Sequence, residues 1–388
     1  MNIKSLLIGS ASAAVLSTSA LAADAIVYAD PEPMEYVRIC DVYGAGYYYI
    51  PGTETCLKIG GYVRFQWQSP AGAVTSNPAF DGYGTYARFV PHFDARTQTE
   101  WGTLRSFGEV RFQYDTTAAG PAVTSNAIIE HAFIDIGDRN FLRVGYNWRP
   151  HGVWIGAGGN VEDGQYGRGG ANQIAYYFNH TQPNGSGTAA PGKTGISGFI
   201  SVLDNPADDS WSTNIEAGVG YGWGSGRVAV SAAYDSIMTG LAYDVGTGFS
   251  AASGSAWSIK AGIEQAFTPT ITARLAVLYN SRPDVLAGGQ VYGLGWQSAS
   301  YSSQWSVLAG ADFKFSPKAA LNLTVQWWDR NERNSPANLN LWNNNWYAAV
   351  GVNWQPVSGL SVRPEVNYIK SYDHGSAWGG RLRIQRSF

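Results

Sequence analysis

The strongest constraint on the fold is an alternation of apolar and polar residues with a period of two, which recurs along most of the 388-residue chain. In the segment 85–100, for example, Phe89 and Phe93 alternate with Arg88 and Asp94. Successive side chains of a β-strand point to opposite faces of the sheet, so this pattern indicates strands with one apolar and one polar face.

Sixteen segments of this kind can be delimited along the chain. A strand tilted across the hydrocarbon core of a bilayer needs about 9–11 residues, and most of the segments reach that length. The sequence therefore predicts an all-β fold, a 16-stranded antiparallel transmembrane β-barrel over residues 56–388. The predicted strands are 56–68, 85–100, 102–115, 126–138, 140–150, 171–180, 194–205, 212–223, 226–236, 256–268, 270–282, 304–316, 318–330, 344–356, 359–371 and 378–388.

The connections between these strands alternate between short turns and long loops. The short turns are rich in Gly, Pro and Asp, which tight hairpins require, and the long loops are 69–84, 151–170, 237–255, 283–303 and 331–343. Short periplasmic turns and long extracellular loops are typical of outer-membrane barrels. Residues 181–193 (TQPNGSGTAAPGK) fall where a short turn is expected. Either this turn carries an insertion, or the assignment of the strands beside it is shifted.

Composition supports a barrel that spans a membrane. Only 14% of the residues are charged, against about a quarter in typical globular proteins, while Gly (47), Tyr (23) and Trp (15) are abundant. A coiled coil, a disordered acidic chain and a basic nucleic-acid-binding protein are excluded, so no nucleic-acid partner is expected. Aromatic residues gather at both ends of the apolar faces, as at Trp67 and Trp101, where two interfacial belts are expected. A soluble β-sandwich is the alternative, but it would not place Trp in this way.

The N-terminus predicts export. Residues 1–22 combine a basic start at Lys4, a short apolar stretch and small residues before a cleavage site after Ala22, which together indicate a signal peptide. The alternative is a buried or anchoring helix. Residues 23–55 then precede the first strand and are expected on the periplasmic side, with a role that the sequence leaves open.

Cys40 and Cys56 are the two cysteines of the chain. In an oxidising compartment the simplest interpretation is a disulfide, which for a loop of this size stabilises the fold by about 3 kcal/mol. A metal site would need more ligands, so neither a metal nor a cofactor is expected.

The polar strand faces must line the inside of the barrel, because closing the sheet directs the apolar faces toward lipid. Sixteen strands enclose a lumen too wide for side chains to fill, so the lumen should hold water. Closure makes the first and last strands neighbours. We therefore expect one positive patch on the pore wall, formed by Arg64, Arg88, Arg111, Arg381 and Arg383. The alternative is that these charges merely keep the wall hydrated.

The third long loop, 151–170, is rich in glycine and contains Glu162 and Asp163. If this loop folds into the lumen, the two carboxylates face the basic wall. Opposed charges across a narrow pore create a transverse field that sets ion preference. The alternative is an exposed surface loop.

Residues 22–65 contain the stretch EYVRICDVYGAGYYYIPGTETCLKIGGYVRF. This stretch closely resembles the general porins of Rhizobium- and Brucella-type alphaproteobacteria, and the resemblance extends over essentially the whole chain. It implies a homotrimer in the outer membrane of a Gram-negative bacterium, in contact with outer-membrane lipid and lipopolysaccharide. It also implies an inward-folded third loop and passive diffusion of small hydrophilic solutes.

The last predicted strand ends at Phe388, with Trp378, Leu382 and Ile384 on the same face. A terminal aromatic residue on an alternating strand is similar to the signal read by the outer-membrane assembly machinery. The alternative is an ordinary edge strand.

The function predicted from these features is a porin for small hydrophilic molecules and ions. A substrate-selective channel, for example for sugars, is the alternative, with an aromatic path formed by Trp154, Tyr166, Trp328 and Tyr347. Catalysis is not expected, because the five histidines have no recognisable nucleophile or carboxylate spacing. An adhesive surface protein would need a narrow or plugged barrel.

Overall fold

The computed structural model describes residues 38–69, 82–116, 124–153, 160, 170–204, 213–244, 248–281, 285–287, 305–328, 345–371 and 375–388. The predicted signal peptide, residues 1–22, lies outside the described residues. The compact unit considered below spans Ile39–Phe388.

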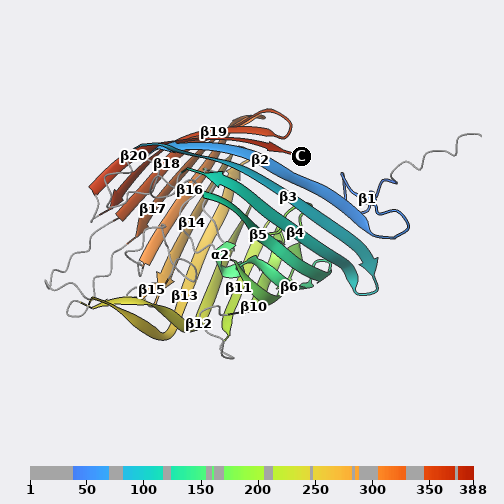
Figure 1. Cartoon of the computed structure of the whole chain (residues 1–388), viewed down its shortest axis with the longest axis horizontal. Coiled ribbons are helices and arrows are strands. Elements are labelled where there is room, and N and C mark those ends of the chain that lie inside the picture. Colours follow the sequence, from blue (N-terminus) through green and yellow to red (C-terminus); the bar gives the residue numbers. More distant parts are fainter. Residues whose placement is uncertain are drawn as a thin grey trace, which may run out of the picture. The chain divides into compact units, whose positions relative to one another are not determined.

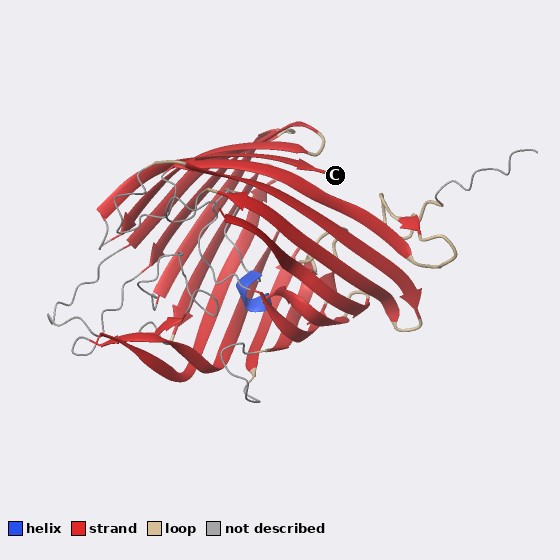
Figure 2. Ribbon diagram, viewed as in Figure 1, coloured by secondary structure: helices blue, strands red, loops and turns tan. Residues whose placement is uncertain are grey.

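Sixteen long antiparallel strands of this unit form one closed sheet (Figures 1 and 2). They are β2 (Cys56–Ser69), β3 (Gly84–Thr99), β4 (Gly102–Asp115), β5 (Thr124–Gly137), β6 (Phe141–Trp148), β7 (Gly170–Phe178), β10 (Thr194–Leu203), β11 (Asn214–Trp223), β12 (Gly226–Asp244), β13 (Gly248–Thr268), β14 (Ile271–Asn280), β16 (Trp305–Ser316), β17 (Ala319–Trp328), β18 (Asn345–Val357), β19 (Leu360–Ser371) and β20 (Gly375–Ser387). The sheet closes where β2 pairs with β20, from Tyr62 opposite Ser387 to Ser69 opposite Gly380. This confirms the predicted barrel, and each predicted strand corresponds to one of these sixteen.

Several shorter elements accompany the sixteen long strands. They are β1 (Tyr48–Tyr49), which pairs with β2, the hairpin of β8 (His180–Thr181) and β9 (Ala190–Pro191), β15 (Val285–Ala287), which pairs with β12, and α2 (Pro150–Val153). Among the described residues, no helix is long and apolar enough to cross a membrane.

One predicted loop is wrong. Most of 237–255 continues the β12–β13 hairpin, from Met238 opposite Gly254 to Asp244 opposite Gly248. The sequence there is rich in Gly, Ala and Ser, so it shows no apolar alternation. Strand pairing depends on backbone hydrogen bonds, which need no such pattern.

The two faces of the strands differ as the alternation predicts. On β3, Phe89 and Phe93 are 43% and 50% exposed, whereas Asp94 and Arg96 on the opposite face are buried. The exposed apolar face points outward, and the buried polar face lines the lumen. Exposed rings also mark both ends of the outer face, as predicted. They include Trp67, Tyr114, Trp305 and Trp346 near the long loops, and Trp101, Phe267, Phe315 and Trp354 near the short turns.

The predicted disulfide joins Cys40 to Cys56, the first residue of β2. It closes a loop over residues 40–56 that also contains β1. Tyr47 is buried against the two cysteines. The disulfide therefore fixes the described part of the N-terminal segment to the start of the barrel.

Phe388 lies at the seam where the barrel closes. Its backbone N–H donates to Gly61 O at 3.0 Å, and the Gly61 N–H donates to Phe388 O at 3.1 Å. Its ring stacks against Phe89, with 6.4 Å between the ring centroids. The terminal residue thus joins the last strand to the first two.

Deleting Phe388 should slow assembly of the barrel, because both hydrogen bonds and the aromatic contact at the seam are lost. The measurement is the yield of folded, heat-modifiable protein in outer-membrane fractions. Phe388→Tyr keeps the ring and the backbone contacts, and should assemble like the natural chain. Equal yields for the deletion and the natural chain would contradict the prediction.

Candidate functional site in the barrel lumen

Three arginines meet on the lumen wall beside the seam. Arg64 on β2 lies directly opposite Arg88 on β3, and Arg383 on β20 lies opposite Gln66 on β2. We call Arg64, Arg88 and Arg383 the seam arginine cluster. The strand register brings these three of the five predicted residues together, and their role as a basic wall of the pore stays a prediction.

The seam arginine cluster is held by neutral groups. Arg64 Nε donates to Gln385 Oε1 at 2.8 Å, and Arg88 Nε donates to Gln113 Oε1 at 2.7 Å. Arg383 donates to Gln66 Oε1 at 2.8 Å and to the Tyr86 hydroxyl at 3.3 Å. Amide and hydroxyl acceptors fix the guanidinium groups without cancelling their charge.

The other two arginines of the predicted patch are paired with carboxylates. Arg111 lies 2.6 Å from Glu130, and Arg381 lies 3.1 Å from Glu365. Elsewhere on the wall, Arg274 is bonded to both Glu264 and Asp312 at 2.5 Å. Of the five predicted arginines, the three that are bonded to neutral groups therefore lie together at the seam.

Three further acidic residues of the lumen, Glu130, Asp135 and Glu216, were not predicted from the sequence. Asp135 and Glu216 each stand between apolar neighbours on their strands, so the alternation was a signal that could have found them. Glu130 was harder to place. It lies at a β-bulge, where the register between β4 and β5 shifts after Glu109, so a period of two fails there.

The third long loop begins inside the lumen. Arg149 Nε donates to Glu216 Oε1 on β11 at 2.7 Å, and the His151 backbone N–H donates to Glu216 Oε2 at 2.9 Å. The His151 ring lies between the hydroxyls of Ser231 on β12 and Ser258 on β13, each 2.9 Å away. The short helix α2 is thereby held against the inner wall.

Asn160 extends this path to the far side of the barrel. Its side-chain amide donates to Thr324 Oγ1 on β17 at 2.9 Å and to Ala349 O on β18 at 3.2 Å. The described residues of the third loop therefore contact both the β11–β13 wall and the β17–β18 wall. Glu162 and Asp163 lie outside the described residues, and their position opposite the arginines stays a prediction.

The aromatic path of the sugar-channel alternative receives little support. Trp154 and Tyr166 lie outside the described residues. The Tyr347 side chain is fully buried, so it presents no face to a passing solute.

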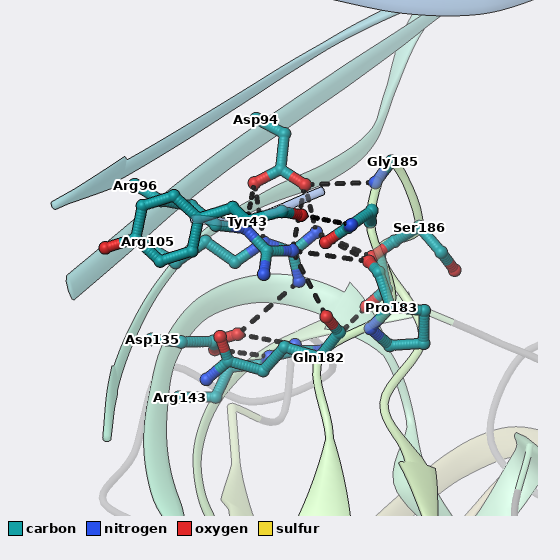
Figure 3. A network of polar contacts seen from close by, with 12 residues as sticks. Tyr43, Asp94, Arg96, Arg105, Asp135, Arg143, Gln182, Pro183, Gly185 and Ser186 are labelled. Atoms are coloured by element: carbon teal, nitrogen blue, oxygen red, sulfur yellow. Dashed lines mark hydrogen bonds and ion pairs between the residues drawn. The ribbon is translucent and has the colours of Figure 1, made fainter. Parts of the chain in front are cut away.

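At the short-turn end, residues 179–193 form an insertion. β7 and β10 pair in regular register on either side of it, from Phe178 opposite Gly198 to Gln173 opposite Leu203. The two predicted strands beside residues 181–193 are therefore correctly assigned. Of the two explanations offered by the sequence, an insertion in the turn is the right one. The inserted residues meet a network of buried arginines and aspartates on β3–β6 (Figure 3).

A closed barrel with an apolar exterior, a charged lumen and third-loop residues such as His151 and Asn160 on its inner wall defines a channel of the outer membrane. The family model described as the porin subfamily matches residues 24–384, and the chain belongs to that family. Porin Omp2b of Brucella suis biovar 1 and Porin Omp2b of Brucella neotomae are each 33% identical to it, over 100% of both chains.

Solved structures agree in fold. The outer membrane channel DcaP of Acinetobacter baumannii superposes with a TM-score of 0.60 at 14% identity, covering 88% of this chain and 99% of that chain. OprB of Pseudomonas putida gives a TM-score of 0.58 at 12% identity, covering 86% and 94%. The protein is thus an outer-membrane porin of a Gram-negative bacterium, as the sequence resemblance predicted.

His151 should make the third-loop anchor sensitive to acid. Burial, followed by the nearby charges of Lys260 and Arg149, lowers the pKa of His151 well below its ordinary value of about 6.5. The anchored state therefore favours the neutral ring. The neutral His151 ring therefore contributes fully to anchoring above pH about 6.5. This contribution is lost as the pH falls toward the lowered pKa of His151.

The measurement is open-channel noise in planar bilayers between neutral and acidic pH. Noise should rise on acidification in the natural chain. His151→Gln keeps an amide for the two serines but does not titrate, so its noise should change less. Identical pH responses of the two chains would contradict this role for His151.

Proposed function

We propose that this porin passes small hydrophilic molecules and ions by passive diffusion, and that the seam arginine cluster favours anions along one wall of the lumen. The observation that carries the proposal is the set of neutral partners around Arg64, Arg88 and Arg383. Rings of fixed charge inside a pore set ion preference, and a low-dielectric wall strengthens their effect.

The acidic residues of the third loop, Glu162 and Asp163, oppose this cluster in the proposal. Together they create a transverse field that orients dipolar solutes as they pass. The contacts of His151 with β11 and of Asn160 with β17 and β18 support an obstruction of the lumen by this loop.

We further propose that the protein assembles as a homotrimer in contact with outer-membrane lipid and lipopolysaccharide. OmpT of Vibrio cholerae, which shares the fold with a TM-score of 0.56, has been solved in a trimer form. Phe388 at the seam supports recognition by the outer-membrane assembly machinery.

Replacing all three cluster arginines with glutamine should shift the reversal potential toward cation preference. We expect a change on the order of 10 mV in a tenfold salt gradient, where perfect selectivity corresponds to about 59 mV. The matched control is Arg111→Gln with Glu130→Gln, which removes an ion pair without changing the net charge. An unchanged reversal potential in the triple variant would refute the anion preference.

Neutralising the loop with Glu162→Gln and Asp163→Asn should have the opposite effect and raise anion preference. The same bilayer recording measures it, and a homotrimer should insert in steps of three equal conductances. If the reversal potential does not move, the two carboxylates do not line the constriction. If folded protein shows no conductance at all, passive diffusion through this lumen is refuted.

A further inference from the structure

Residues 179–193 occupy a position where a porin needs only a tight turn. Within the described part of the chain, the other short-turn connections, such as those between β3 and β4 and between β11 and β12, span two or three residues. Here His180 pairs with Pro191 and Thr181 pairs with Ala190, forming the β8–β9 hairpin. We call residues 180–191 the lumen hairpin.

The wall beneath the lumen hairpin carries a buried charge network. Asp94 on β3 accepts hydrogen bonds from Arg96 at 3.0 and 3.1 Å and from Arg105 at 2.8 and 2.9 Å. Asp135 on β5 accepts from Arg143 on β6 at 2.7 and 2.8 Å, and Arg105 Nη1 lies 3.8 Å from Asp135. Three arginines and two aspartates leave one positive charge in excess.

These side chains are on the lumen face, yet they are buried. Asp94, Arg105, Asp135 and Arg143 are each 0% exposed, although they belong to the wall of a water-filled pore. A side chain on the wall of an open lumen is exposed to the lumen, so another part of the chain must cover these residues.

The lumen hairpin supplies that cover through its backbone (Figure 3). Arg105 donates to Ser186 O at 2.8 Å, and Arg143 donates to Gly187 O at 2.7 Å. Arg96 donates to Gln182 O at 3.2 Å, and the Gly185 N–H donates to Asp94 Oδ2 at 3.0 Å. The carbonyls therefore face the excess positive charge, and the single N–H faces a carboxylate. This complementarity fixes both the position and the direction of the segment.

Close packing adds to the polar contacts. A Cβ atom at Gly187 would lie 2.5 Å from the His131 ring, so only glycine fits there. Gly185 has a φ of +67°, which favours glycine, and its Cβ would lie 2.9 Å from His92. Ala189 packs against the buried lumen-facing cluster that includes Tyr177 and Phe199. The segment is thus fitted to the wall rather than laid loosely across it.

Two neighbouring parts of the chain lie against the lumen hairpin. Asn184 donates to the backbone carbonyl of Tyr43, in the loop closed by the disulfide. A small cavity beside the hairpin is lined by Pro150 and Val153 of α2 together with Thr188 and Pro191. The lumen hairpin therefore lies between the N-terminal loop and the start of the third loop.

We infer that the lumen hairpin is a second constriction, on the periplasmic side of the third loop, and that it limits the size of solutes that the channel passes. The Asp94–Arg96–Arg105–Asp135–Arg143 network holds it in place. This inference rests on the porin function and assigns part of the size selectivity to a segment other than the third loop.

The test replaces residues 182–189 with Asn-Gly, which closes β8 and β9 with a tight turn. Single-channel conductance in planar bilayers should rise about 1.5-fold or more, since the narrowest sections dominate the resistance of a pore. Liposome swelling should admit larger neutral sugars than the natural chain does. Unchanged conductance and an unchanged size limit in the folded variant would overturn the inference.

A second variant decides the question if the shortened chain does not fold. Asn184→Cys places one thiol at the exposed tip of the hairpin, and the two natural cysteines are bonded to each other. Labelling by a charged methanethiosulfonate reagent should lower conductance in discrete steps, one for each pore of the homotrimer. Ser225→Cys, on the exposed turn between β11 and β12, is the matched control and should show no step.

The outcomes separate the two claims. A natural chain that folds but does not conduct overturns the porin function itself. A natural chain that conducts, together with a labelled Asn184→Cys chain whose conductance is unchanged, overturns the second constriction alone.

Discussion

The whole structure depends on the requirement that every backbone N–H and C=O group in lipid finds a hydrogen-bond partner within the protein. An open sheet would leave two unpaired edges, each with several unsatisfied groups. The pairing of β2 with β20 removes both edges at once. Closure then determines everything else, because it assigns one strand face to lipid and the other to an enclosed lumen. The low charge content of the chain follows from the same division.

The arginines of the lumen have two kinds of hydrogen-bond partner. On β3–β6, two aspartates pair with three arginines, and the network holds a peptide segment whose carbonyls face the remaining positive charge. At the seam, arginines are fixed by glutamine amides and a tyrosine hydroxyl, which leaves their charge available to passing ions. Removing one partner of a buried ion pair costs about 3–5 kcal/mol, whereas a hydrogen bond between a charged and a neutral group contributes about 1.5–3 kcal/mol. The first arrangement therefore suits a structural role, and the second suits a functional one.

The sequence predicted the barrel well because strand alternation and turn residues are local properties. Sixteen strands, the disulfide and the neighbourhood of Arg64, Arg88 and Arg383 all follow from period, spacing and closure. The errors arise where a local pattern is absent or interrupted. The β12–β13 extension has no apolar alternation, and a bulge hides Glu130. The fold of residues 179–193 depends on partners such as Asp94 and Arg143, which are about 45 to 90 residues away in sequence.

The seam has a consequence for how the protein matures. Tyr62 pairs with Ser387, although the two residues lie near opposite ends of the sequence. This contact forms only after the last strand has been exported, and closing so long a loop costs conformational entropy. Arg64 and Arg383 come from opposite ends of the chain, and like charges brought together on neighbouring strands resist that final step. A partly assembled barrel already pairs Arg64 with Arg88, but it lacks Arg383 beside them, so the seam arginine cluster is complete only after closure. If the cluster sets ion preference as proposed, an unclosed intermediate that leaks across the membrane would discriminate between ions less than the finished barrel does.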